Sequence, residues 1–227
     1  MEKTYFISGI DTDCGKTIAT GLIAKYLLSI NKNVITQKLV QTGTSGIADD
    51  IITHRKIMNK TLFAEDKNKI TCPYVFKLPA SPHLSAKLEN TEIDCSIIDK
   101  NTKILNNNFD TVLLEGAGGL HVPINNKVNI IDFIEEHNYP LILVTSPKLG
   151  SINHTLMSLE ICYKRKIKLT GLIYNNHPVN NSFIQKDTLE VIGKFLRKHF
   201  PRVPLLEVPK LENNKYPIID FSELVIT

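Results

Sequence analysis

The amino-acid sequence predicts an α/β fold in which a parallel β-sheet is flanked by helices on both sides. Short runs rich in Val, Ile and Leu alternate along the chain with longer segments whose apolar residues recur at helical spacing. Several of the short runs are apolar throughout, as strands of a parallel sheet are when helices cover both of its faces. The chain has 227 residues, which corresponds to one large domain, so we expect a single domain over residues 1–227.

The expected elements follow in order along the chain. Residues 5–9 form a β-prone run that ends in a turn, and residues 17–30 then carry apolar side chains at helical spacing. Residues 34–40 are the second expected strand, and the Gly-, Ser- and Thr-rich residues 42–46 predict a loop. Further strands are expected at residues 111–114, 141–145 and 169–174, with helices at roughly residues 95–106, 129–137, 152–163 and 183–199. The proline-rich end of the chain favours strand and loop.

Composition and charge exclude several classes of protein. Apolar residues make up 42% of the chain, yet no stretch approaches the ~18 uninterrupted apolar residues of a membrane helix. Residues 1–9 have neither a charged n-region nor a small-residue cleavage site, so we do not expect secretion by a signal peptide. Lysine and arginine total 27 against 23 for aspartate and glutamate, and their scatter argues against a nucleic-acid partner. The four cysteines lie far apart without a CxxC pair, which indicates free thiols in a reducing cytoplasm rather than a zinc site or disulfides.

The segment GIDTDCGKT at residues 9–17 has the features of a phosphate-binding loop, because it joins the first expected strand to the first expected helix. Backbone N–H groups and the positive end of the helix dipole surround a polyphosphate in such a loop. Lys16 would reach the β- and γ-phosphates, and the Thr17 hydroxyl would bind Mg²⁺. Gly9 and Gly15 are one residue further apart than in the usual motif, and the alternative is a turn that merely begins a helix. We predict nucleotide contacts at Asp13, Cys14, Gly15, Lys16, Thr17 and Ile18.

Acidic and basic side chains are expected at the same edge of the sheet. Residues 110–119, DTVLLEGAGG, form an apolar strand that ends in Glu115 and continues into a glycine-rich loop. An acid at such a strand end can hold Mg²⁺, and the glycines let the backbone approach a ligand, although such loops can also be tight turns. Lys38 ends the second strand, and Asp49 and Asp50 follow in the next helical segment. Taken alone, Lys38 would be a surface lysine, the acids would favour a helix amino terminus, and Cys14 would be either packing filler or a reactive thiol.

Five sequence blocks together resemble those of the dethiobiotin synthetases, enzymes of biotin biosynthesis. The blocks are GIDTDCGKT at residues 9–17, KLVQTG at 38–43, SPHLSA at 81–86, VLLEGAGG at 112–119 and KLGSINH at 148–154. They lie in register over most of residues 5–175, which makes the resemblance more specific than a phosphate-binding loop alone. The resemblance implies a homodimeric P-loop NTPase fold with a seven-stranded parallel sheet. It also implies ATP as co-substrate, Mg²⁺ as cofactor, and 7,8-diaminononanoate and CO₂ as substrates.

The resemblance implies a reaction and roles for individual residues. In that family an amine of 7,8-diaminononanoate takes up CO₂ to give a carbamate, ATP phosphorylates the carbamate, and the second amine closes the ureido ring with release of phosphate. By position, the resemblance implies metal ligands at Thr17, Asp50 and Glu115, and phosphoryl-stabilising cations at Lys16 and Lys38. It further implies substrate contacts at Thr12, Thr42, Gly116, Ala117, Gly118, Gly119 and Asn153, the last near a dimer interface, and an adenine contact at Asn175.

Two alternatives remain from the sequence. The nearer is a related P-loop ATPase of the cobyrinic acid amide synthase or ParA/MinD type. The ParA/MinD switches carry an extra lysine near the start of the loop, where this chain reads GIDT, and amide synthases need a glutamine-hydrolysing domain for which the chain has no room. The second alternative is a noncatalytic nucleotide-binding module, which a phosphate-release assay with and without diaminononanoate would separate from a synthetase.

Overall fold

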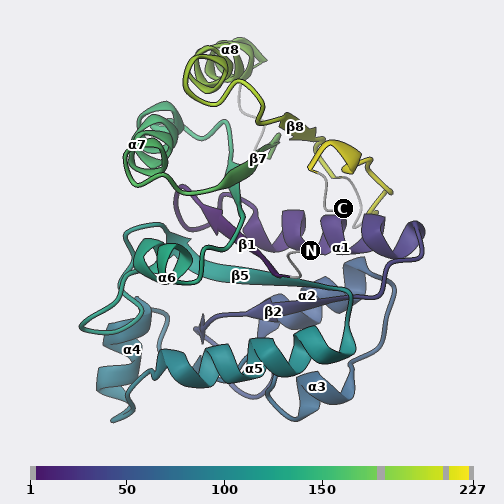
Figure 1. The fold of residues 1–227 in the computed structure, drawn as a ribbon, viewed down its shortest axis with the longest axis vertical. Coiled ribbons are helices and arrows are strands. Elements are labelled where there is room, and N and C mark those ends of the chain that lie inside the picture. The colour runs from purple at the N-terminus through teal and green to yellow at the C-terminus, as the bar shows by residue number, and fades with distance from the viewer. Residues whose placement is uncertain (1–3, 178–181, 212–214, 225–227) are drawn as a thin grey trace.

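The computed structural model describes residues 4–177, 182–211 and 215–224, and its centre is a parallel sheet of six strands in the order β2-β5-β1-β6-β7-β8. These strands are β1 (Thr4–Gly9), β2 (Val34–Lys38), β5 (Thr111–Gly119), β6 (Leu141–Thr145), β7 (Leu169–Asn175) and β8 (Leu205–Val208). Two short strands, β3 (Gln41–Thr42) and β4 (Val75–Phe76), pair with each other in parallel, apart from the main sheet. Figure 1 shows the strands enclosed by helices.

Helices occupy both faces of the sheet, as the alternating pattern predicted. They are α1 (Lys16–Ser29), α2 (Asp49–Ile57), α3 (Ala64–Lys67), α4 (Pro82–Leu88), α5 (Cys95–Asn108), α6 (Ile130–Glu136), α7 (Ser151–Lys164) and α8 (Ser182–His199), followed by a 3₁₀ turn at Ser222–Leu224. The five helices expected from apolar spacing are confirmed, with ends that differ by at most two residues. No helix in the described ranges combines the length and the apolar character needed to cross a bilayer.

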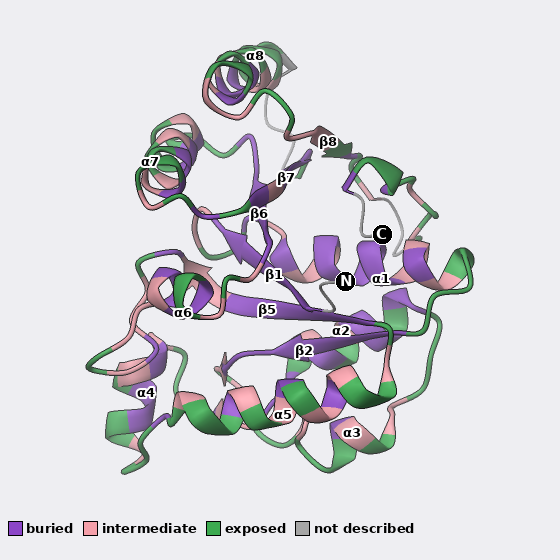
Figure 2. Cartoon of the chain, in the orientation of Figure 1, coloured by how far each residue is buried: buried purple, intermediate pink, exposed green. Residues whose placement is uncertain are grey.

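Two apolar cores cover the two faces of the sheet. In β1, Phe6 packs into the core that contains α6, with its ring 6.4 Å from that of Phe133, whereas Tyr5 and Ile7 pack into the core that contains α1. Successive strand residues point to opposite faces, so a strand covered on both sides needs apolar residues at every position. Figure 2 shows the central strands as buried along their length. This two-sided burial is what the continuous apolar runs predicted.

The sheet differs from expectation at its edge and at the glycine segment. The seven strands implied by the family resemblance are wrong for the described residues, whose sheet has six. The chain leaves the sheet after Lys38, because the Gln41 backbone N–H bonds to Tyr74 and β3 then pairs with β4. Residues 116–119, expected as a loop, instead continue β5, with Gly119 opposite Gly9 after an irregularity in the ladder. Thr42, also expected in a loop, ends β3.

Candidate active site

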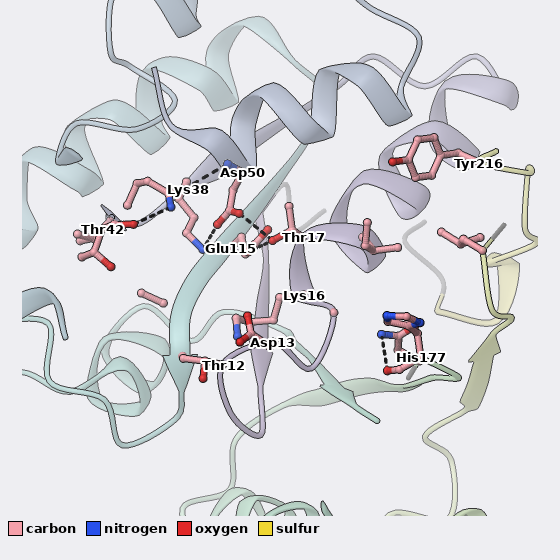
Figure 3. Close-up of a pocket in the computed structure, with 18 residues that line it drawn as sticks. Thr12, Asp13, Lys16, Thr17, Lys38, Thr42, Asp50, Glu115, His177 and Tyr216 are labelled. Carbon is pink, nitrogen blue, oxygen red and sulfur yellow. Dashed lines mark hydrogen bonds and ion pairs between the residues drawn. The ribbon is translucent and has the colours of Figure 1, made fainter. Parts of the chain in front are cut away.

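A cavity of about 680 Å³ opens at the carboxyl ends of the central strands (Figure 3). Its walls come from the loop before α1, the end of β2, the start of α2, β5, the last residue of β7 and the C-terminal segment. Ligands of open α/β sheets bind at this edge, outside the carboxyl ends of the strands. The sequence-predicted residues that line the cavity are Thr12, Asp13, Gly15, Lys16, Thr17, Ile18, Lys38, Thr42, Asp50, Glu115, Ala117, Gly118 and Asn175.

Four predicted site residues do not line this cavity. Cys14 is 2% exposed and packs into the core beneath the loop, which argues against a reactive thiol. Gly116 is buried, and Gly119 lines a separate hollow beside α7. Asn153 is exposed in the first turn of α7. Within one chain, Asn153 is therefore separate from the cluster that contains the two lysines.

The loop before α1 begins the helix without a side-chain cap. Gly15 is the capping residue, with a φ of 98° and no side-chain hydrogen bond. Lys16 is 7% exposed, and its Nζ donates to the carbonyl oxygen of Asp11 at 2.7 Å. The uncapped first turn and the ammonium group together give this end of the cavity positive charge. The local structure is thus suited to an anion such as a phosphate group.

We expect Gly15→Ala to weaken nucleotide binding more than a matched change elsewhere. A Cβ at this position would lie 2.1 Å from Asn175 Nδ2, in addition to the strain of a positive φ. Gly150 is the control, because it caps α7 with a φ of 90° and an added Cβ would meet no neighbouring atom within 4 Å in the described structure. Left-handed backbone alone costs about 1–2 kcal/mol for a residue with a Cβ.

Urea unfolding should therefore show a loss of about that size for Gly150→Ala and a larger loss for Gly15→Ala. Calorimetric titration with ADP should show weaker binding for Gly15→Ala alone. Equal losses of stability and affinity in the two variants would mean that the close approach of Asn175 to the loop has no energetic importance.

Lys38 lies between two carboxylates at one end of the cavity. Its Nζ is 2.5 Å from Asp50 Oδ2 and 2.9 Å from Glu115 Oε1, and it donates to the Gly116 carbonyl oxygen at 2.9 Å. The Thr17 hydroxyl lies 2.9 Å from Asp50 Oδ1 and 3.1 Å from Glu115 Oε1. Four elements, α1, β2, α2 and β5, thus bring one hydroxyl, one ammonium and two carboxylates to a single point.

Burial and charge act in opposite directions on this cluster. Burial alone would lower the pKa of Lys38, but the negative charges of Glu115 and Asp50 outweigh it and raise that pKa above its usual value. Burial alone would raise the pKa of Glu115, but the Lys38 charge and a hydrogen bond from His54 hold that pKa well below its usual range. Lys38 and Glu115 are therefore both charged at neutral pH.

Sequence reasoning missed one residue of this cluster, His54. Its side chain is fully buried, and Nε2 lies 2.8 Å from Glu115 Oε2. A signal for it existed, because His54 follows Asp50 by four positions within α2, which places both on one face of the helix. A polar residue at that spacing indicates a second side chain directed toward the same site.

The far end of the cavity is formed by Asn175 and by three residues that the sequence did not single out. Asn175 is buried and donates from Nδ2 to the carbonyl oxygens of Cys14 at 3.1 Å and His177 at 3.4 Å. His177, Leu211 and Tyr216 border the same cavity, and Figure 3 shows His177 and Tyr216 on the side away from Lys38. No local pattern marks these three residues, because they meet only when the C-terminal segment folds back.

Similarity to known proteins extends over nearly the whole chain. A family model described as an AAA domain matches residues 3–215. The chain is 50% identical over 211 residues to ATP-dependent dethiobiotin synthetase BioD 2 of Pasteurella multocida, with 93% of this chain and 99% of that protein covered. It is 56% identical over 178 residues to BioD 2 of Haemophilus influenzae, with 78% and 93% covered. It is 43% identical to BioD of Chlorobaculum tepidum, with 89% and 85% covered.

Solved structures share the fold at much lower identity. A ParA family ATPase from Chlorobium tepidum has a TM-score of 0.54 at 16% identity, covering 94% of this chain and 87% of that chain. The MinC:MinD complex of Aquifex aeolicus has a TM-score of 0.54 at 12% identity, covering 90% and 79%. These likenesses confirm the predicted P-loop NTPase fold and show nothing further. The identities of 43–56% with the synthetases decide the family: the chain is a member of the dethiobiotin synthetases.

Proposed function

We propose that this chain is an ATP-dependent dethiobiotin synthetase, a ligase that makes dethiobiotin from 7,8-diaminononanoate, CO₂ and ATP. The observation that carries the proposal is the meeting of Lys16 and Lys38 in one cavity with Thr17, Asp50 and Glu115. Phosphoryl transfer needs positioned positive charge rather than a covalent nucleophile. The relatives that are 43–56% identical carry this activity in their names and support the same assignment.

The nucleotide would extend through the cavity from the loop to the C-terminal segment. Its phosphates would bind the N–H groups at the start of α1, and Lys16 would exchange the Asp11 carbonyl oxygen for the β- and γ-phosphates. The base would lie by Asn175, where the rings of His177 and Tyr216 offer surfaces for stacking. One domain, residues 1–227, would thus form both ends of the nucleotide site.

The charges in the cavity favour a divalent cation bound with the nucleotide. Asp50 and Glu115 both pair with Lys38. The two lysines and these two carboxylates together carry no net charge, so they leave the charge of a polyphosphate uncompensated. Mg²⁺ prefers oxygen ligands and is commonly held by one or two carboxylates together with substrate phosphates. Thr17, Asp50 and Glu115 fit that set of ligands and would hold it. When bound, Mg²⁺ would neutralise charge on the phosphate oxygens.

The substrate would occupy the part of the cavity beside Thr12, Thr42 and residues 116–119. One amine attacks CO₂ and loses a proton to give the carbamate, whose oxygen then attacks the γ-phosphorus while ADP leaves. The second amine attacks the carbonyl carbon of the carbamic-phosphoric anhydride and loses a proton, while the bond from that carbon to the phosphate oxygen breaks, so that phosphate leaves and the ring closes. Lys38 would stabilise the oxygens of the transferring phosphoryl group, and the exposed carboxylate of Asp13 would attract the substrate amines.

We also propose a homodimer with the active site near its interface. Asn153 is exposed on α7 and does not border the cavity of its own chain. A contact between Asn153 and the distant carboxylate of the substrate would therefore come from the partner chain. Sedimentation equilibrium gives the mass in solution, and a monomer that is fully active would contradict this arrangement.

We expect Asp50→Asn to raise the Mg²⁺ concentration needed for half-maximal activity by about tenfold or more. The change keeps the size of the side chain and removes a charge that lies beside Thr17 and Lys38. Asp49→Asn is the matched control, because Asp49 is the preceding residue of the same helix and is exposed. Steady-state Mg²⁺ titrations of both variants check this, and a rise in the Asp49 variant as well would point to a general effect on α2.

The activity itself is tested by incubating the protein with 7,8-diaminononanoate, bicarbonate, Mg²⁺ and ATP and measuring a ureido product by mass spectrometry. A parallel assay follows phosphate release with and without the diamine. Phosphate release that does not depend on the diamine would favour a related P-loop ATPase. Absence of turnover, with nucleotide binding retained, would favour a noncatalytic nucleotide-binding module.

A further inference from the structure

A chain of buried polar side chains runs from the Glu115 carboxylate into the protein. Glu115 Oε2 accepts from His54 Nε2 at 2.8 Å, and His54 Nδ1 lies 3.0 Å from the Thr36 hydroxyl. Arg55 Nη1 donates to that hydroxyl at 2.6 Å, and Asp66 holds Arg55 through hydrogen bonds of 2.8 and 2.9 Å. Every member is at most 2% exposed. The carboxylate is thus joined to a rigid interior, not to solvent.

The donors and acceptors of this chain fix the tautomer of His54. A guanidinium can only donate, so the Thr36 hydroxyl oxygen accepts from Arg55. The hydroxyl hydrogen then has His54 Nδ1 as its acceptor among the described contacts. Because an ionised carboxylate can only accept, His54 Nε2 carries the hydrogen that faces Glu115. Each group has a partner, and the imidazole has one defined orientation.

As a result, the two oxygens of Glu115 have different surroundings. Oε2 is engaged by His54, whereas Oε1 faces Thr17 and Lys38 in the cavity. We propose that His54 is a positioning residue that holds the Glu115 carboxylate so that one oxygen, Oε1, is presented to the Mg²⁺ of the bound nucleotide. The inference rests on the proposed function, because that function places Mg²⁺ beside Glu115.

His54 and Lys38 act on different oxygens of Glu115. Lys38 contacts Oε1 and is shared with Asp50, whereas the hydrogen bond from His54 to Oε2 fixes the orientation of the carboxylate. Histidines and hydrogen-bonded carboxylates around metal sites act in this way, and loss of such outer partners typically reduces metal affinity or activity by 10- to 100-fold. A histidine that merely filled space would be replaceable by another side chain of similar size.

Two substitutions distinguish a histidine that orients the Glu115 carboxylate from one that only fills space. The amide nitrogen of glutamine can take the place of Nε2, so His54→Gln keeps a donor toward Glu115. Asparagine is shorter and can take only the place of Nδ1, so His54→Asn keeps a polar group toward Thr36 and loses the donor toward Glu115. Calorimetric titration with ADP, with and without Mg²⁺, measures the effect on the metal complex independently of turnover.

We expect His54→Asn to weaken Mg²⁺-dependent ADP binding by about 10- to 100-fold, while binding of ADP without Mg²⁺ is unchanged. His54→Gln should stay near the wild type, and activity should show the same order. An Asn variant with wild-type Mg²⁺ dependence would overturn the proposal, as would equal losses in the two variants. Because the titration needs no diamine, it remains decisive even if the chain makes no ureido product.

If His54→Asn does not fold, ¹⁵N NMR of the wild type provides the test. The Nε2–H signal of His54 is assigned by its absence from the Gln variant. The proposal requires this signal to shift when Mg²⁺ is added to the ADP complex, because the carboxylate that it bonds then binds the metal. An unchanged signal would overturn it.

Discussion

Lys38→Met is expected to slow ring closure on the order of 10²- to 10³-fold and to lower the free energy of unfolding by about 3–5 kcal/mol. Methionine is an unbranched side chain one atom shorter than lysine, and it carries no charge. The rate should fall because the cation proposed to stabilise the transferring phosphoryl group is lost. Stability falls because Glu115 is fully buried and loses the ammonium group 2.9 Å from its Oε1.

A double variant separates these two effects. When Lys38→Met is combined with Glu115→Gln, no unpaired charge remains buried at position 115. Most of the lost free energy of unfolding should therefore be regained, as measured by urea unfolding. Asp50 is 22% exposed and can be hydrated without its partner. Activity should not return, because neither side chain supplies positive charge and the carboxylate proposed to hold Mg²⁺ is also lost. If the double variant regained substantial product formation, Lys38 would only balance Glu115 and would not act on the phosphoryl group.

Arg55→Met is expected to lower the free energy of unfolding by about 3–5 kcal/mol. Arg55 and Asp66 form two hydrogen bonds, and both are 2% exposed. Removal of the guanidinium leaves the carboxylate buried beside Phe63, whose ring also packs against Arg55 with the guanidinium carbon 4.8 Å from its centre. The change also removes the donor that holds the Thr36 hydroxyl.

Arg165→Met is the matched control for this change. Arg165 also contacts two acids, Asp132 and Glu135, but it is 27% exposed, and such pairs contribute about 1 kcal/mol or less. Urea unfolding at neutral pH should therefore separate the two variants clearly. Similar losses would indicate that the Arg55–Asp66 pair is worth no more than a surface ion pair.

The loss of unfolding free energy caused by Arg55→Met should depend on pH. Burial tends to raise the pKa of Asp66, but hydrogen bonds and charge from Arg55 and a hydrogen bond from Thr71 lower it overall. A lowered folded-state pKa gives stability that is complete above the unfolded-state pKa, about 4, and is lost as the pH falls. The difference in stability between the wild type and Arg55→Met should therefore shrink in acid. A difference that stays constant from neutral pH to pH ~3 would exclude this linkage.

The order of the elements was predictable because burial on both faces leaves a clear local pattern. β6 occupies Leu141–Thr145, the predicted range, since its apolar run is flanked by Pro140 and polar residues. The sequence predicts a loop for the glycine segment after Glu115, because glycine itself carries no preference for a strand. Pairing with β1 extends β5 to Gly119, and that tertiary contact has no counterpart in the local sequence.

The grouping of the predicted site residues follows from one rule about parallel sheets. Strands that run in one direction end at one edge, so Lys38 and Glu115 were expected beside the loop that holds Lys16. Contacts that depend on the packing of distant segments were not predictable. Tyr216 reaches the cavity because the C-terminal segment crosses α1, where Lys25 donates to its carbonyl oxygen. His54 was predictable from its spacing of four residues after Asp50 in α2, but only the two acids at the start of that segment were named from the sequence.

The position of β5 between β2 and β1 has a consequence for how the chain is made. β1 and β2 leave the ribosome well before β5, and in the described sheet β2 is paired with β5 alone. Until β5 inserts, two strands present open edges, and Glu115 is absent from its place beside Thr17 and Lys38. The centre of the sheet and the end of the cavity that contains Thr17, Lys38 and Glu115 therefore assemble in the same step. Mg²⁺ and nucleotide would bind only the chain in which that step is complete. Their binding would therefore stabilise the state in which β5 is inserted during synthesis.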